Sequence, residues 1–269
     1  MLAHFMLTRF NVPTKGREAE FRARNGWLAR RFDLFETFCL PSIAGQTTYD
    51  FRWIIYFDSA TPSEYRTRIQ AAQHIFPFIA LFREELPLDG VIADVLAILP
   101  EGCTRILTTR LDNDDALASD FAETLRRAAD AAPDGTALNI PNGYAWRNGW
   151  VYAAEDQSGP FASVVESTSG YQTIWARPHA LLGELFVLRQ IQAPPSWLQV
   201  VHGDNVTNRV KGRRRPSKVL QGRFILKAYD EACDPSRLAI FIENLIRYPL
   251  RQLREAVVRG IKPFLKVVR

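Results

Sequence analysis

Residues 51–57 read FRWIIYF, an almost uninterrupted apolar, β-prone run that leads into Asp58. Helices cover both faces of a parallel sheet, so a strand in such a sheet is apolar on both faces, and this run fits that description. Residues 61–74, TPSEYRTRIQAAQH, then predict a helix with Thr61 as its cap and Pro62 at its first helical position. Together they predict a strand-helix unit.

The same alternation continues along the chain in both directions. The patterns of apolar residues predict strands at residues 2–10, 76–82, 104–111 and 137–140. They predict helices at residues 18–39, 91–99 and 121–131, the last capped by Ser119 or Asp120. Alternating strands and helices indicate an α/β fold with a mostly parallel central sheet flanked by helices.

The pattern changes after Pro141. Two aromatic runs flank Asn148-Gly149, and this dipeptide is the strongest local signal of a hairpin. Residues 170–176 predict an edge or return strand. We therefore expect a small antiparallel element after the parallel half, with residues 1–230 as one domain and residues 231–269 as a basic, amphipathic helical tail.

Composition limits the class of protein. The chain has 269 residues, 47% of them hydrophobic and 23% charged, with a net charge of +5. No apolar stretch approaches the roughly 20 residues that span a bilayer. The first nine residues lack the pattern of a secretory signal. We expect a cytoplasmic protein that is soluble or peripheral on the inner face of the cytoplasmic membrane.

Residues 112–115, DNDD, follow directly after the predicted strand 104–111. Ligands of open α/β sheets bind beyond the carboxyl ends of the strands. Clustered carboxylates repel one another unless a cation neutralises them, and Mg²⁺ prefers one or two carboxylates together with substrate phosphates. The cluster predicts a metal-bridged diphosphate site. The alternative is an acidic turn that caps a helix beginning near Ala116.

These segments resemble the GT-A glycosyltransferases. The run LDNDDAL at 111–117 is similar to the Asp-x-Asp segment of that fold, and residues 41–58 are similar to its second strand and the approach to it. More narrowly, the chain resembles the bacterial putative rhamnosyl transferase family in FMLTRFN at 5–11, TRLDNDD at 109–115 and VHGDN at 201–205. The resemblance covers about residues 3–226.

The resemblance implies the roles of site residues. The metal, Mg²⁺ or Mn²⁺, is expected on Asp115 with Asp114 or Asp112, assisted by His202. Asp58 is expected to contact the nucleoside. The remaining expected donor-binding residues are Arg110, Asp112, Asn113, Asp114 and Arg209.

The segment 201–209, VHGDNVTNR, is similar to the one that supplies the catalytic base in many inverting GT-A enzymes. An inverting transfer needs a carboxylate near the acceptor hydroxyl. Asp204 is the expected base, although Asn205 stands where the usual Asp falls, and Glu166 is the reserve candidate. Asp204 and His202 also fit ordinary loop residues.

Three surface features have two interpretations each. The basic run from Arg209 to Lys227 fits a segment that closes over the diphosphate or a solvated loop; without a recognition motif, we do not expect nucleic acid binding. The aromatic residues between Tyr144 and Trp197 fit an acceptor platform or ordinary packing. The tail from Leu238 onward fits a helix on an anionic membrane or a helix docked on the domain.

The expected activity is transfer of a sugar from a nucleoside-diphosphate donor to a glycan or lipid-linked acceptor in polysaccharide biosynthesis. By resemblance the donor is dTDP-L-rhamnose or a related deoxyhexose, and the transfer is metal-dependent and inverting. A metal-dependent nucleotidyl or phosphoryl transferase is an alternative, although the sequence has no Gly-rich phosphate loop. A non-catalytic nucleotide-sugar-binding protein is another.

Overall fold

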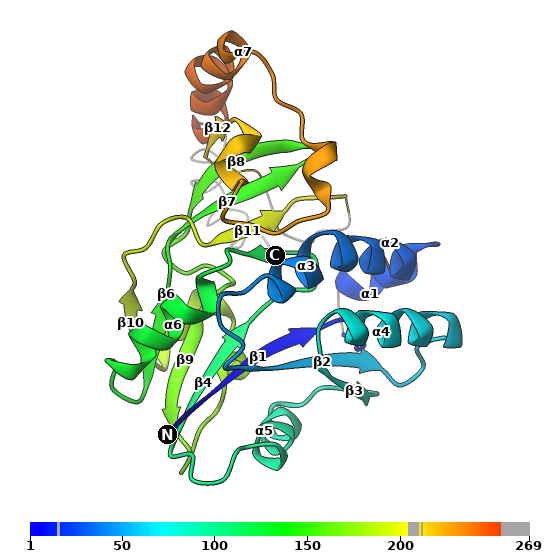
Figure 1. Cartoon of the computed structure of the whole chain (residues 1–269), viewed down its shortest axis with the longest axis vertical. Coiled ribbons are helices and arrows are strands. Elements are labelled where there is room, and N and C mark those ends of the chain that lie inside the picture. The colour runs from blue at the N-terminus through cyan, green and yellow to red at the C-terminus, as the bar shows by residue number, and fades with distance from the viewer. Residues whose placement is uncertain (15–16, 204–209, 211, 254–269) are drawn as a thin grey trace, which may run out of the picture.

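The computed structural model of the chain describes residues 1–14, 17–203, 210 and 212–253 (Figure 1). A seven-stranded sheet lies at its centre, with strand order β10-β6-β9-β4-β1-β2-β3. Its strands are β1 Leu2–Arg9, β2 Arg52–Asp58, β3 Ile79–Arg83, β4 Arg105–Arg110, β6 Thr136–Asn139, β9 Ser163–Ser167 and β10 Val187–Gln190. All run in one direction except β9, which is antiparallel to β4 and β6. The mostly parallel α/β fold is confirmed.

Helices cover this sheet on both faces. They are α1 Arg17–Arg22, α2 Trp27–Leu34, α3 Leu40–Ala44, α4 Ser63–Ile75, α5 Leu88–Ala97 and α6 Phe121–Asp130. Strand β2 shows why both faces must be apolar. Trp53 and Phe57 pack in the core with α2, α4 and α6, whereas Ile54 and Tyr56 pack on the opposite face with α5.

Several helix ends differ from their predictions. The helix predicted for 18–39 is interrupted because Gly26 adopts the left-handed conformation at φ 69°, and a π-helical turn, Phe35–Cys39, joins α2 to α3. Pro62, not Thr61, occupies the N-cap of α4, because the Thr61 hydroxyl donates to the Asp58 carbonyl instead. Asp120 precedes α6 without a side-chain cap, because its carboxylate accepts from Arg223.

The strand predicted at residues 170–176 is wrong. The backbone amides of Gln172 and Thr173 donate to the Glu166 carboxylate at 2.7 and 3.0 Å, and Thr173 has φ 68°, so the segment cannot pair as a strand. Residues 174–176 form a single 3-10 turn, and β9, which the sequence pattern did not indicate, lies in the sheet instead.

A second sheet of five strands has the order β12-β8-β7-β11-β5. Its strands are β5 Ala116–Leu117, β7 Asn142–Arg147, β8 Trp150–Glu155, β11 Trp197–Val200 and β12 Arg213–Arg215. The predicted hairpin is confirmed, with φ 49° at Asn148 and 78° at Gly149. Only β11 and β7 are parallel neighbours.

Beyond this sheet, α7, Arg237–Ile242, continues through a π-helical turn, Glu243–Arg247, and lies beside β12 (Figure 1). Within the described ranges, no helix has both the length and the apolar character that crossing a membrane requires.

Candidate functional site

The candidate site lies at the carboxyl edge of the central sheet. Strands β1, β2 and β4 run parallel, so Asn11, Asp58 and Asp112, which follow or end them, come to the same edge. The Asn11 amide oxygen accepts from the Asp58 backbone N–H at 2.9 Å, and its amide nitrogen donates to Thr61 at 3.1 Å. This side chain joins the ends of the first two strands.

Asp114 is the best-connected acid of the site. Its Oδ2 accepts from Arg31 Nη1 at 2.8 Å and lies 2.7 Å from His202 Nε2, although 88 residues separate it from the histidine. Burial disfavours the charged carboxylate, but the nearby Arg31 guanidinium and the hydrogen bond from His202 outweigh it and hold the pKa of Asp114 well below its usual range. Asp114 is therefore an anion at neutral pH.

Asp115, beside it, has the opposite character. Its carboxylate is buried and Oδ1 accepts from the Val200 backbone N–H at 2.8 Å. Burial, with the negative charges of Asp114 and Asp112, raises the pKa of Asp115 well above its usual range. Through this bond Asp115 links the acidic turn to Val200, the last residue of β11. Because His202 follows Val200 by two positions, the bond helps to place His202 opposite Asp114.

The other two residues of the acidic cluster differ in exposure. Both oxygens of Asp112 accept from Arg110, Nε to Oδ1 and Nη2 to Oδ2, each at 3.2 Å, and its side chain is 38% exposed. Asn113 is buried and its amide nitrogen donates to the Phe10 carbonyl at 3.0 Å, which ties the turn to the end of β1. Asn113 was expected to bind the nucleotide-sugar donor. Its side chain points inward in this arrangement, so the side chain does not make that contact.

Two arginines that the sequence analysis did not single out reach the site from the N-terminal helices. Arg22 Nη2, from α1, donates to Asp58 Oδ2 at 2.7 Å, and Arg31 reaches Asp114 from α2. The remaining oxygen of Asp58 accepts from the Ala60 backbone N–H. The only signal in the sequence was the excess of arginine between residues 17 and 31, which carries no motif.

The structure describes Glu166, one of the two candidates for the catalytic base. Glu166 is paired in register with Ile106 on β4, four residues before the end of that strand, and both of its oxygens accept backbone N–H groups. The position and hydrogen bonds of Glu166 indicate a structural role. Asp204 lies outside the described residues, as does Arg209.

The basic run is largely built into the second sheet and its turns. Arg213–Arg215 form β12, Arg214 is buried with its guanidinium 3.4 Å from the Trp150 ring centroid, and Arg223 pairs with Asp120 at 2.9 Å. Among the described residues, the exposed Arg213 and Arg215 lie on a strand and the exposed Lys218 lies in a 3-10 turn, so this part of the run belongs to regular elements.

Most of the aromatic residues proposed as a platform pack internally. Trp146 and Tyr152 are buried, and Trp197 stacks on Phe161 with ring centroids 5.0 Å apart. Ordinary packing is the better description of these side chains.

The site offers two side chains to a divalent ion. Asp114 and His202 supply a carboxylate oxygen and an imidazole nitrogen, donors that Mn²⁺ accepts readily and Mg²⁺ accepts in part. In the described part of the chain, no group of three or more His, Cys, Asp or Glu side chains is placed to hold an ion. The pair therefore fits an ion that completes its coordination with diphosphate oxygens and water.

Similar folds occur among solved structures. They include S. aureus TarS 1–349 in complex with UDP (10% identity, TM-score 0.46, covering 74% of this chain and 60% of that chain). They also include a putative nucleotide-diphospho-sugar transferase from Desulfovibrio desulfuricans G20 (12% identity, TM-score 0.38, covering 77% and 84%). A third is 4-diphosphocytidyl-2C-methyl-D-erythritol synthase (13% identity, TM-score 0.40, covering 77% and 94%). Such values are too low to transfer an activity, and the chain spans 60% of the TarS fragment.

No curated protein matches the chain. Residues 3–214, which are most of its length, match the model of the family described as "Putative rhamnosyl transferase". The protein thus belongs to the putative rhamnosyl transferase family, and this membership makes it a glycosyltransferase.

Proposed function

We propose that the protein transfers a deoxyhexose, L-rhamnose in the first instance, from a nucleoside-diphosphate donor to a glycan or lipid-linked acceptor. The observation that carries the proposal is the ionised Asp114, held by Arg31 and His202 at the carboxyl edge of a parallel sheet. Family membership supports the reaction class, and the edge position supports nucleotide binding.

The site residues have distinct proposed roles. Asp58, at the end of β2, binds the nucleoside, and Arg110 and Arg31 hold the diphosphate, since guanidinium groups make paired hydrogen bonds to phosphate oxygens. Asp114 and His202 hold Mn²⁺ or Mg²⁺, whereas Asp115, the metal ligand that the resemblance implied, is buried and accepts the Val200 N–H, so we assign it no metal contact. When bound, the ion supplies positive charge that stabilises the leaving diphosphate.

Asp204 is the proposed base, which takes the proton of the acceptor hydroxyl as that oxygen attacks the anomeric carbon. It follows His202 by two residues in the sequence. Attack opposite the leaving diphosphate inverts the anomeric configuration. The buried, backbone-bonded Glu166 has no part in this scheme.

The test is a panel of nucleotide sugars, each scored for thermal stabilisation of the protein with and without Mn²⁺. We expect one nucleoside-diphosphate deoxyhexose to stabilise the protein only with the ion, and His202→Gln to abolish that shift. Asp130→Asn, at an exposed aspartate on α6, is the control and retains it. Stabilisation by nucleoside triphosphates alone, followed by their cleavage, would instead identify a nucleotidyl or phosphoryl transferase.

Anomeric NMR of the product tests the stereochemistry. Asp204→Asn is expected to lower kcat by about 10²-fold or more, as loss of a general base does, while leaving donor binding unchanged. Unaltered kcat, or a product with retained configuration, contradicts the assignment of Asp204.

A further inference from the structure

The C-terminal helical segment, residues 237–253, exposes its apolar side chains. Six of them are each more than half exposed: Leu238, Phe241, Leu245, Ile246, Leu250 and Leu253. Their spacings of three, four, one, four and three residues place them on one side of a helix. We call these six residues the apolar stripe.

The opposite side of the same segment is polar and is attached to the protein. Glu243 is 4% exposed and accepts from both Arg247 and Arg251. The Asn244 side chain makes two hydrogen bonds to the backbone of Arg214. Its Oδ1 accepts from the Arg214 N–H at 2.7 Å, and its Nδ2 donates to the Arg214 carbonyl at 3.0 Å. These bonds attach the segment to β12, at the edge of the second sheet.

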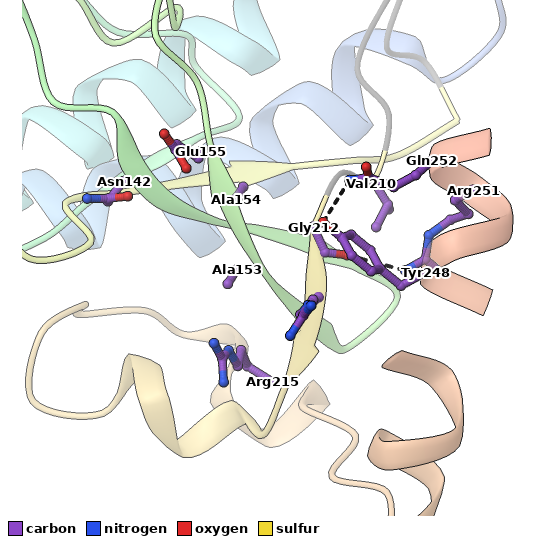
Figure 2. A pocket seen from close by; sticks show the side chains of 11 residues that line it. Asn142, Ala153, Ala154, Glu155, Val210, Gly212, Arg215, Tyr248, Arg251 and Gln252 are labelled. Atoms are coloured by element: carbon purple, nitrogen blue, oxygen red, sulfur yellow. Dashed lines mark hydrogen bonds between the residues drawn. The ribbon is translucent and has the colours of Figure 1, made fainter. Parts of the chain in front are cut away.

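Figure 2 shows the pocket beside this attachment, with Tyr248 and Arg251 directed from the helix toward Gly212 and β12. A cavity of about 670 Å³ lies between them, and its lining includes Arg213, Arg215 and Arg251 but a single acid, Glu155, among the described residues. No acid of the described chain forms an ion pair with Arg213 or Arg215.

This polarity is the reverse of that of an ordinary surface helix, which turns its apolar side to the core and its charges to water. Here the polar side, with the buried Glu243 and with Asn244, faces the sheet, and the apolar side faces outward. Contiguous exposed apolar surface of this kind marks a binding surface. Arg237 and Arg247 are exposed and each is next in sequence to a residue of the stripe, and their positive charges determine the kind of partner.

We propose that the segment 237–253 lies in the plane of an anionic lipid bilayer, with the apolar stripe at the boundary of headgroups and acyl chains. Amphipathic helices with basic residues at their margins bind such surfaces through apolar burial together with attraction to lipid phosphates. A second copy of the chain is a poorer occupant, because two facing stripes related by a two-fold axis bring like-charged arginines together. The proposal does not depend on sugar transfer.

The test is co-sedimentation of the full chain with vesicles of phosphatidylglycerol and phosphatidylcholine, compared with phosphatidylcholine alone. We expect binding only to the anionic vesicles, and a loss of binding when salt is raised from about 0.1 to about 1 M. The double variant Phe241→Ser/Leu245→Ser is expected to bind at least 100-fold more weakly. Ile75→Ser/Leu96→Ser is the matched control, since its residues are 54% and 56% exposed on α4 and α5, and it binds as the wild type does.

Three results overturn the proposal. Equal binding of the double variant and the wild type excludes the apolar stripe as the contact. A wild-type dimer that the double variant converts to monomer, without vesicle binding by either, identifies a second copy as the partner. A thermal midpoint that falls sharply in the double variant, but not in the control, shows that the chain itself covers the apolar stripe.

Discussion

Asp114 and Asp115 are neighbours whose pKa values are shifted in opposite directions, so the same substitution, Asp to Asn, is expected to have different effects at the two positions. Asp114 is 3% exposed and bonded to Arg31 and His202. Asn at this position keeps the shape but removes the charge that faces the guanidinium of Arg31, whose side chain is 16% exposed. Breaking a buried ion pair on one side costs about 3–5 kcal/mol. Because Arg31 retains some exposure, we expect Asp114→Asn to lower the free energy of unfolding by about 3 kcal/mol.

Burial and the charges of Asp114 and Asp112 raise the pKa of Asp115 and so favour its uncharged form, which Asn resembles, and the Asn amide oxygen can still accept from Val200. The direction of its pKa shift also sets a pH dependence. A carboxyl whose pKa is raised by folding stabilises the native state at low pH, and that contribution is lost as the pH rises from the unfolded pKa toward the folded one. We therefore expect Asp115→Asn to become more stable relative to the wild type as the pH rises from 5 to 8.

The assay is urea unfolding of the three proteins at pH 5 and pH 8, without metal. With a denaturant slope of about 3 kcal/mol/M, the Asp114→Asn midpoint falls by roughly 1 M. An Asp115→Asn variant that loses as much stability as Asp114→Asn, or an Asp114→Asn variant as stable as the wild type, refutes the assigned charge states.

Three other substitutions test the surrounding structure. Burial, assisted by the charge of Arg126, lowers the pKa of His4 to about 3, so folding opposes its protonation, and the wild type should lose about 2 kcal/mol between pH 7 and pH 5; His4→Gln should remove most of that slope in urea unfolding. A Cβ at Gly143 would lie 2.1 Å from the Trp197 ring, so Gly143→Ala should cost about 3 kcal/mol or prevent folding, whereas Gly183→Ala, with open space around it, should unfold as the wild type does. Glu166→Gln should lower stability by about 1–3 kcal/mol, because an amide nitrogen cannot accept a backbone N–H, and leave kcat unchanged; a large loss of kcat in folded protein would restore Glu166 as the base.

The elements that could be predicted are those whose signal is local. The run at residues 51–57 is apolar on both faces and becomes β2, with core on both sides. Asn148 and Gly149 adopt the positive φ angles that their turn requires. Because the carboxyl edge of a parallel sheet follows from strand direction, the place of the acidic turn at that edge could also be anticipated.

The prediction of a strand at residues 170–176 was wrong because a carboxylate on the preceding strand competes for the backbone of this segment, and a pattern of apolar residues does not record such a contact. The Glu166 carboxylate accepts the amides of Gln172 and Thr173, which a strand would have used for pairing. The inward side of the tail is a similar case: its apolar residues predicted an amphipathic helix, but only the bonds between Asn244 and Arg214 show that the polar side faces the protein.

By itself, the sequence determined the fold class, the acidic cluster and its position after a buried strand, because periodicity and composition record which faces are buried. Only the tertiary structure decided how the acids divide their roles. Asp114 is charged because Arg31 and His202, 83 residues before it and 88 residues after it, meet at its carboxylate. The pKa of Asp115 is raised because the side chain is buried and lies near the negative charges of Asp114 and Asp112, and its oxygen accepts the Val200 amide. Charge state depends on neighbours in space, which the order of residues does not record.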